Sequence, residues 1–381
     1  MALLPQELFD AIIDEIHDKK TLKSCALVAT SFLRPSRWKL FRKVRLGLGR
    51  HSRDTAAALA ESPHLVSYIC DLVILMPSTV PDSVAVAGLL RSVQNIESLL
   101  VFGRAPSVNW NSVEHEACSA LLDCLSRPSL RFLHLSSMQG VPAALISAAT
   151  AIPVVSFFHI RMDVQEEIFE QLHASAPAPR LRHLTLGDTG PAVPLICDFL
   201  LHPRKPAYTQ QIERLTICID QDNASYGGRI IAACAATLKY LAVSLENITQ
   251  LPLLPFVLEV EIKVWVGYDR RLPALFSQNI SQIASSLPLA ETITLVVFIE
   301  PIHPDPEVDW PDEAPLPIFG PPFMDRTQLL HLRQVHCILR REGPFDDISA
   351  LFDRFVLAME SMMPGLQGTG ILRCTLDNPQ R

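Results

Sequence analysis

Three short segments of the sequence carry residue types that bind metals or take part in catalysis. "HEAC" at 115–118 begins like the zinc motif H-E-x-x-H, but no second histidine follows. His331, His336 and Cys337 lie close in sequence, yet strand alternation turns His336 away from its neighbours and predicts a solvated histidine. Five acids within 305–313 lack the glycine turn of a calcium loop. None of these segments predicts a metal site.

Elsewhere the chain lacks the common catalytic motifs. It contains no G-x-G-x-x-G after a strand, no G-x-x-x-x-G-K-[ST] and no G-x-S-x-G. Its nine cysteines are scattered and form no C-x-x-C pair, which favours buried, reduced thiols. We therefore expect no catalytic residue, no metal and no cofactor, with an enzyme of unrecognised site as the alternative. No signal peptide or membrane-spanning stretch is evident, which predicts a cytoplasmic or nuclear protein without membrane contact.

The net charge of −7 is unevenly distributed. Residues 1–50 carry ten basic and five acidic side chains, while the remainder carries 23 and 35. A basic N-terminus on an acidic body favours an acidic partner at that end. The basic residues around Trp38 could contact phosphates, but a solvated helix face or an acidic protein partner ranks above nucleic acid.

The first fifty residues predict three short helices. After Pro5, which suits a first helical turn, apolar residues recur at helical spacing at Leu8, Ile12 and Ile16. Thr21 is the expected N-cap of a second helix, and Pro35 is expected to open a third. Helices this short bury little area against one another, so a partner or the following domain must complete their apolar surface.

This ordered set of residues resembles the F-box family. The matching residues are Leu4-Pro5, Glu7-Leu8, Ile12, Ile16, Leu22, "CALVATSF", Trp38 and Leu40-Phe41. The closing "LFRKVRL" resembles the fungal form of the family, in which the box runs directly into a first strand. Two positions depart from the pattern: Phe32 stands where many relatives have Trp, and Ala29 where many have Cys. Phenylalanine fills an aromatic socket but donates no hydrogen bond.

The resemblance implies docking onto the Skp adaptor of cullin–RING ubiquitin ligases. It implies adaptor contacts at Leu4, Pro5, Leu8, Ile12, Ile16, Leu22, Val28, Phe32 and Trp38. Such a receptor performs no chemistry, because ubiquitin transfer belongs to other subunits and the receptor brings a protein substrate close. The alternative is a non-catalytic scaffold whose N-terminal helices only cap the rest of the chain.

From residue 54 onward, helix-like segments alternate with short strands of the form Φ-x-x-Φ-x-Φ, where Φ is apolar. The clear strands are Ile69/Leu72/Ile74, Ile96/Leu99/Val101, Leu130/Leu133/Leu135, Val155/Phe158/Ile160, Leu181/Leu184/Leu186, Ile212/Leu215/Ile217 and Leu238/Leu241/Val243. Weaker matches are Val257/Val260/Ile262, Ala290/Ile293/Leu295, Leu332/Val335/Cys337 and Ile371/Cys374/Leu376. Steps of 25–34 residues between the clear strands are close to a leucine-rich-repeat period.

Alternation of strands and helices implies right-handed crossovers and a parallel sheet. We predict an α/β fold: a three-helix F-box over 1–46, then an irregular leucine-rich-repeat-like α/β solenoid with parallel strands over 47–381. A compact doubly wound domain is the alternative, but its strands would be apolar without interruption, and these alternate.

Two features concern the protein substrate. Residues 301–322 hold eight prolines and five acids, so they form either a functional flap or a solvated insertion, with Trp310 as a possible anchor. Middle residues of successive strands would line the concave face, and four of these are expected to contact the substrate: His134, His183, Arg214 and Lys239. The sequence does not identify that substrate.

Overall fold

The structure is a computed structural model. It describes residues 5–77, 79–104, 107–162, 178–187, 192–203, 206–218, 223–244, 251–266, 285–299, 330–341, 348–363, 366 and 368–377. The chain divides into two compact units, Met1–Leu181 and Arg182–Arg381. The first unit therefore holds both the N-terminal helices and the first repeats, and the module boundary at residue 46 stays a prediction.

The three expected N-terminal helices are present, and a strand follows directly. They are α1 (Gln6–Glu15), α2 (Lys19–Val28) and α3 (Thr30–Phe41), followed by β1 (Lys43–Leu46). The expected N-cap was wrong: Asp18, not Thr21, caps α2, because its carboxylate accepts the Thr21 backbone N–H at 2.7 Å. The expected start of the third helix was also wrong, because Pro35 lies inside α3.

A side chain from α1 compensates for this internal proline. Pro35 has no N–H to donate to the Ser31 carbonyl one turn earlier. Gln6 Nε2 donates to that carbonyl at 3.0 Å instead. The Ser31 carbonyl, which Pro35 leaves without a helical donor, therefore accepts a hydrogen bond that joins α1 to α3.

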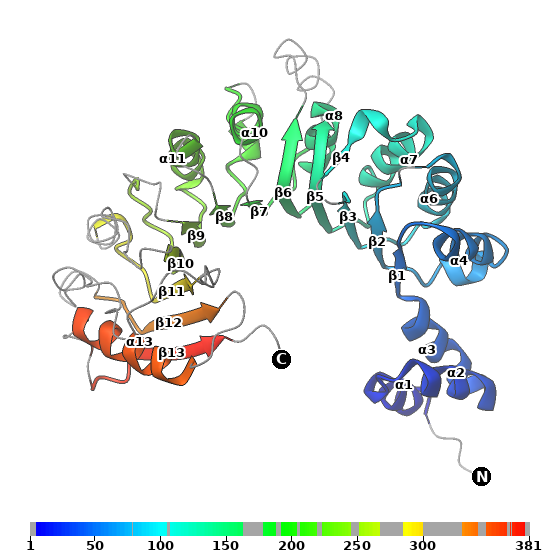
Figure 1. The fold of residues 1–381 in the computed structure, drawn as a ribbon, viewed down its shortest axis with the longest axis horizontal. Helices are drawn as coiled ribbons and strands as arrows, with labels where there is room; N and C mark the ends of the chain where they lie inside the picture. The colour runs from blue at the N-terminus through cyan, green and yellow to red at the C-terminus, as the bar shows by residue number, and fades with distance from the viewer. Residues whose placement is uncertain are drawn as a thin grey trace, which may run out of the picture. The chain divides into compact units, whose positions relative to one another are not determined.

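The remainder of the first unit alternates strands and helices. Its parallel strands run in the order β1, β2 (Asp71–Leu75), β3 (Ser98–Phe102), β5 (Phe132–Val141) and β6 (Val154–Met162), and the short β4 (Val108–Asn109) pairs with β5. The helical elements are α4 (Arg50–Ala60), α5 (Pro63–Val66), α6 (Val80–Ser92), the 3₁₀ turn η1 (Trp110–Ser112), α7 (His115–Leu125) and α8 (Ala143–Ala149). Figure 1 shows α4, α6, α7 and α8 on one side of these strands.

The second unit repeats the same arrangement. Its strands are β7 (His183–Gly187), β8 (Arg214–Cys218), β9 (Tyr240–Ser244), β10 (Glu259–Val266), β11 (Thr292–Ile299), β12 (Gln334–Arg341) and β13 (Leu372–Asp377), each parallel to the next. Its described helices are α10 (Ala192–Leu200), η2 (Pro206–Tyr208), α11 (Ala224–Cys234) and α13 (Ile348–Met362). The predicted parallel, leucine-rich-repeat-like α/β fold is confirmed.

The repeated apolar positions form the core on the helix side of the strands. Strand register aligns Leu99 with Leu133 and Leu184 with Leu215, and all four are buried. The intervening residues point to the opposite side, which we call the open face of each unit. Burial of the Φ positions therefore explains why the strands alternate instead of being continuously apolar.

In two strands, β6 and β13, the apolar positions assigned to the repeat pattern were wrong. Val155 aligns with Leu133 and Phe157 with Leu135, so the large apolar residues that β6 buries are Val155, Phe157 and Ile160, and Ile152 just before the strand is buried as well. Phe158 consequently lies on the open face. In β13, Leu372 is the register partner of Val335, and Cys374 is that of Cys337. The predicted pattern Ile371/Cys374/Leu376 is therefore out of register with Leu332/Val335/Cys337.

Backbone hydrogen bonds also link consecutive repeats at the point where each strand begins. In the second unit, the Arg182 carbonyl accepts the N–H groups of Glu213 at 2.8 Å and Arg214 at 3.0 Å. The Glu213 carbonyl accepts those of Lys239 at 2.8 Å and Tyr240 at 3.1 Å in the same way. This recurring bond pair fixes the register of each strand against the previous one.

Candidate protein-binding surfaces

The three-helix module has a very small core of its own. Ile13 of α1 and Leu22 of α2 are buried, and the rings of Phe9 and Phe32 meet edge to face with centroids 4.9 Å apart. Lys39 Nζ donates to the Ile13 carbonyl at 3.0 Å and to the Asp14 carbonyl, which satisfies the free end of α1. Leu22 was expected to contact a partner, but its burial removes it from any surface. Phe32, half-buried, also supports the internal packing.

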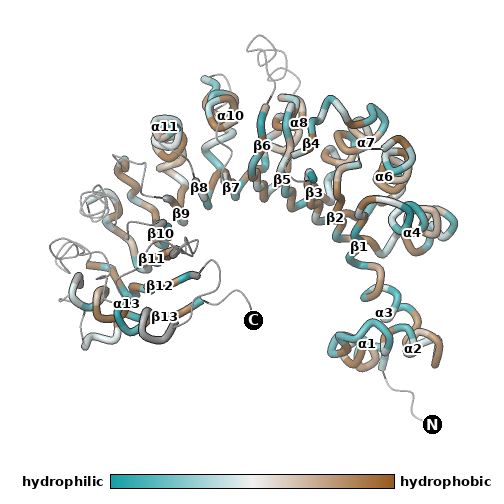
Figure 2. Tube along the Cα trace, in the orientation of Figure 1, coloured by the Kyte–Doolittle hydropathy of each residue, from teal (hydrophilic) through white to brown (hydrophobic). Residues whose placement is uncertain are grey.

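Two groups of apolar side chains in the module remain exposed. On α1, Leu8 is 48% and Ile12 49% exposed, and they lie one turn apart. At the end of α2, Leu27 is 88% and Val28 74% exposed. Figure 2 shows hydrophobic stretches on both helices. Leu27 is a contact candidate that the sequence analysis missed, although it lies within the matched segment "CALVATSF".

The other predicted adaptor contacts are distributed around these groups. Pro5 is exposed and Ile16 is half-buried, while Leu4 lies outside the described residues. Trp38 is 37% exposed, and the Arg42 guanidinium lies 4.7 Å from the ring centroid. Arg42 also pairs with Asp71 of β2 at 3.7 Å. Trp38 is thus held beside the first repeat by a cation–π contact.

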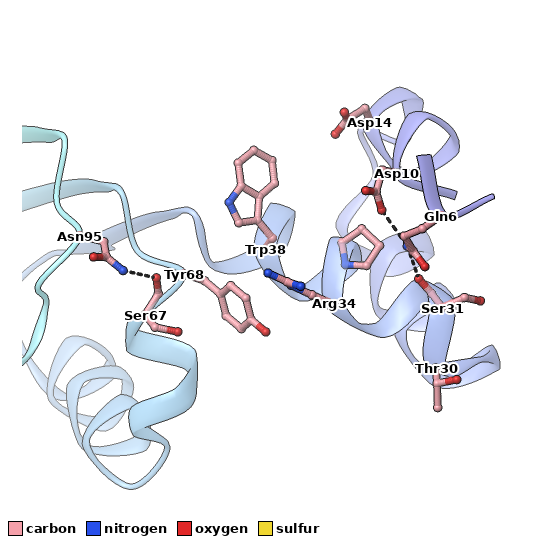
Figure 3. Close-up of a pocket in the computed structure, with 11 residues that line it drawn as sticks. Gln6, Asp10, Asp14, Thr30, Ser31, Arg34, Trp38, Ser67, Tyr68 and Asn95 are labelled. Carbon is pink, nitrogen blue, oxygen red and sulfur yellow. Dashed lines mark hydrogen bonds between the residues drawn. The ribbon is translucent and has the colours of Figure 1, made fainter. Parts of the chain in front are cut away.

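A pocket of about 800 Å³ lies between the module and the first repeats. Its lining residues are Gln6, Asp10, Asp14, Thr30, Ser31, Arg34, Pro35, Trp38, Ser67, Tyr68 and Asn95. In Figure 3, Gln6 Nε2 bridges Asp10, at 2.8 Å, and the Ser31 carbonyl, while Asn95 Nδ2 donates to the Ser67 carbonyl at 3.1 Å. The lining combines polar and charged side chains with two aromatic rings, those of Trp38 and Tyr68.

The open face of the first unit carries an aromatic cluster. The His134 imidazole lies between Phe102 and Phe158, with ring centroids 5.1 and 5.4 Å away. Burial lowers the pKa of His134, so the neutral ring is favoured. The predicted contact residue His134 is therefore part of a half-buried, uncharged surface.

The open face of the second unit carries a polar cluster on β8, β9 and β10. The Arg214 guanidinium lies 4.0 Å from the Tyr240 ring centroid, and the Tyr240 hydroxyl donates to Glu261 at 2.9 Å. Glu261 in turn pairs with Lys263 at 3.5 Å. Burial, and then the Glu261 charge, raise the pKa of Tyr240, so the phenol stays protonated and acts as the donor.

The four predicted substrate contacts do not occupy equivalent positions. His183 and Arg214 are register partners on β7 and β8, and the next residue in that row is Tyr240. Lys239 precedes β9 by one residue and pairs with Glu213 at 3.2 Å, so its assignment to the open-face row was wrong. Trp310 and the segment 301–322 lie outside the described residues.

Two of the three segments with metal-binding residue types lie in the described part of the chain, and the acidic segment 305–313 lies outside it. Glu116 of "HEAC" pairs with Arg91 at 2.7 Å, and burial raises the pKa of Cys118 to about 11. His336 alternates with buried Val335 and Cys337, as predicted, but its Nε2 shares a 2.7 Å hydrogen bond with Thr375 Oγ1. Within the described ranges, no three His, Cys, Asp or Glu side chains could hold a metal ion. Among these residues, no helix is long and apolar enough to cross a membrane.

Comparisons with known proteins give little further guidance. No protein-family model matches the sequence, and no curated protein sequence matches it. Among solved structures, the crystal structure of the Rad7 and Elc1 complex from yeast is similar, with 14% sequence identity and a TM-score of 0.31. That match covers 76% of this chain and 87% of the other. A similarity of this size does not assign a family.

Proposed function

We propose that this chain is the substrate-receptor subunit of a Skp–cullin–F-box ubiquitin ligase. In this role the N-terminal helices dock the Skp adaptor, and the repeats present a protein substrate. The observation that carries the proposal is the exposure of Leu8, Ile12 and Val28 on a folded helical module. Fully burying one such side chain contributes about 1.5–3 kcal/mol, so an adaptor that covers them gains substantially.

The way the module attaches to the repeats argues against a simple cap. Of the three helices, α3 makes the main contacts with the repeats, through α5 and β1. In Figure 1, α1 and α2 lie on the far side of α3 from β1. A cap would bury the apolar side chains of α1 and α2 against the repeat core. Here β1 pairs with β2 instead, and Leu8 and Ile12 remain available.

The remaining parts of the proposal concern the substrate and the chemistry. The two open faces differ in polarity, and each offers a surface of several strands to a protein substrate. The chain itself acts without catalysis, metal or cofactor, and works in the cytoplasm or nucleus. A bound cofactor absorbance or a stoichiometric metal in the purified protein would instead indicate an enzyme.

Co-purification with the Skp adaptor tests the proposal. The test variant is Leu8→Asp with Ile12→Asp, which charges the α1 stripe. The matched control is Val80→Asp with Val84→Asp on α6, since these valines are 56% and 53% exposed, four residues apart and in the same unit. We expect the native chain and the control to retain the adaptor, and the α1 variant to bind at least about 100-fold more weakly.

Circular dichroism of each variant tests whether the fold is retained. If the folded α1 variant binds the adaptor as tightly as the native chain, the proposed surface is wrong. If no version binds, the scaffold alternative replaces the receptor.

A further inference from the structure

The last two strands of the second unit place two thiols directly opposite each other. Cys337 of β12 and Cys374 of β13 are register partners in the parallel ladder. Neighbouring strands lie about 4.8 Å apart, and disulfide-linked residues have Cα atoms about 4.4–6.8 Å apart. Register partners also point to the same face. The backbone therefore already satisfies the first geometric requirement of a disulfide.

The side chains meet beneath a helix. Helix α13, which connects β12 to β13, packs on both strands, and its Phe355 and Met359 are buried. Cys337 is fully buried, whereas Cys374 is half-buried. Both are free thiols. Because register partners project from the same face of the ladder, the two thiols are neighbours, and Cys374 is the one that is partly exposed.

The two thiols differ in pKa and therefore in reactivity. The neighbouring Cys337 thiol lowers the pKa of Cys374, against opposing effects of burial and of the Glu360 carboxylate on α13. The Cys374 thiol, and then burial, raise the pKa of Cys337. Thiolate is the reactive form of cysteine, so Cys374 is the more reactive of the two.

We propose that Cys337 and Cys374 form an oxidation site, at which a hydroperoxide produces a disulfide between β12 and β13. In the first step the Cys374 thiolate attacks a peroxide oxygen of hydrogen peroxide and breaks the O–O bond. This step yields a sulfenic acid and hydroxide, which takes up a proton to become water. In the second step the Cys337 sulfur attacks the sulfenic sulfur, forms the S–S bond and loses its thiol proton. The sulfenic oxygen leaves with a proton as a second water. Two thiols are oxidised, one peroxide is reduced, and a thiol reductant reverses the change.

The bond would restrain β13, which lies at the edge of the described sheet. Among the described strands, β13 pairs with β12 alone, so it separates without disrupting a second ladder. A disulfide between residues 337 and 374 closes the crossover through α13 into a covalent loop. Closing a loop of this length restricts the unfolded chain and stabilises the folded one. Oxidation therefore protects β13 and α13 from local opening.

The protein of residues 1–381 is treated with hydrogen peroxide, and its disulfides are mapped by mass spectrometry after alkylation of free thiols. The variants are Cys337→Ser and Cys374→Ser. The matched control is Cys218→Ser on β8, because Cys218 is half-buried and its register partner on β7 is Gly187. We expect a Cys337–Cys374 disulfide in the native chain and the control, reversed by dithiothreitol and lost in both variants. Oxidation should raise the melting temperature of the native chain by several degrees (~5 °C).

Two outcomes overturn the proposal. One is accumulation of sulfinic or sulfonic acid at Cys374 without a disulfide, which shows that Cys337 does not reach it. The other is a disulfide through a different cysteine. The Cys337→Ser variant also keeps the test informative, because dimedone should label a persistent sulfenic acid at Cys374 in this variant. Absence of that label in a folded variant contradicts the proposed roles.

Discussion

The N-terminal module and the repeats bury their apolar side chains to very different extents. In the first unit's strands, each Φ position has a buried register partner, as Leu99 and Leu133 do. In helices α1–α3 as described, Ile13 and Leu22 are the large apolar residues that are buried, while Leu8, Ile12 and Val28 remain exposed. Each repeat completes the core of its neighbour, whereas in the described part of the chain α1 and α2 pack mainly on α3. The difference indicates which part of the chain requires a partner.

The module is held together by specific polar contacts in place of a large core. Gln6 bonds to the carbonyl left free by Pro35, Lys39 bonds to the end of α1, and Asp18 caps α2. These bonds define the arrangement of the helices without covering their outer apolar surface. Each contributes about 0.5–1.5 kcal/mol at most in such partly exposed settings, so the module opens more readily than the repeats.

Truncating one buried leucine in each region produces the largest expected contrast. Leu99→Ala in β3 removes atoms from the continuous repeat core, and Leu22→Ala removes the same atoms from the module. Each truncation costs about 2–5 kcal/mol in buried surroundings. We expect Leu99→Ala to lower the free energy of unfolding of the repeats, and Leu22→Ala to release only α1–α3. Hydrogen exchange of backbone amides, measured peptide by peptide by mass spectrometry, distinguishes opening of α1–α3 from opening of the repeats.

Adding the Skp adaptor tests whether a partner stabilises the module separately from the repeats. If an adaptor completes the module, it should restore exchange protection to α1–α3 in the Leu22→Ala variant by mass action. It should leave the Leu99→Ala repeats unaffected. Equal loss of protection across both regions in the Leu22→Ala variant would contradict the independence of the module.

Acidification should weaken the repeats through His134. Its pKa is lowered by burial between Phe102 and Phe158, so the unfolded chain takes up the proton first. The associated stability is complete above the unfolded value of 6.5 and is lost as pH falls from there toward the folded pKa. We expect His134→Phe, which retains the aromatic cluster, to lose less stability than the native chain between pH 7 and pH 5. Urea unfolding at each pH measures the difference, and parallel losses in both chains would exclude His134 as the cause.

The sequence predicted the repeats better than the details of the module. Apolar spacing located the strands because burial on one face imposes strict alternation, and it failed in β6, where Phe157 and Phe158 are adjacent and pattern alone cannot select the inward ring. The residues matching the F-box pattern located the exposed Leu8 and Ile12, but not the burial of Leu22. Helix periodicity shows which residues share a face, and it does not show which face another helix covers. The assignment of Lys239 failed for the same reason, since one residue of register reverses a side chain.

The smallest expected effect is an acid response of the module at a much lower pH than that of the repeats. The Asp18 carboxylate accepts the Thr21 N–H at 2.7 Å and the Thr21 hydroxyl at 2.8 Å, and these bonds lower its pKa below 3.8. The stabilisation of α2 is therefore present above that unfolded value and is lost as pH falls through the folded pKa. Asp18→Ala should increase amide exchange over residues 19–28 at neutral pH.

Asp18→Asn should retain an N-capping acceptor but lose the acid dependence. An Asp18→Asn variant whose α2 still opens with the native pH profile would assign the effect to another group. With His134 acting below pH 6.5 and Asp18 only below 3.8, mild acid should loosen the repeats before it removes the α2 cap. This order follows from the two environments, because burial lowers the pKa of His134, whereas hydrogen bonds from Thr21 lower the pKa of the exposed Asp18.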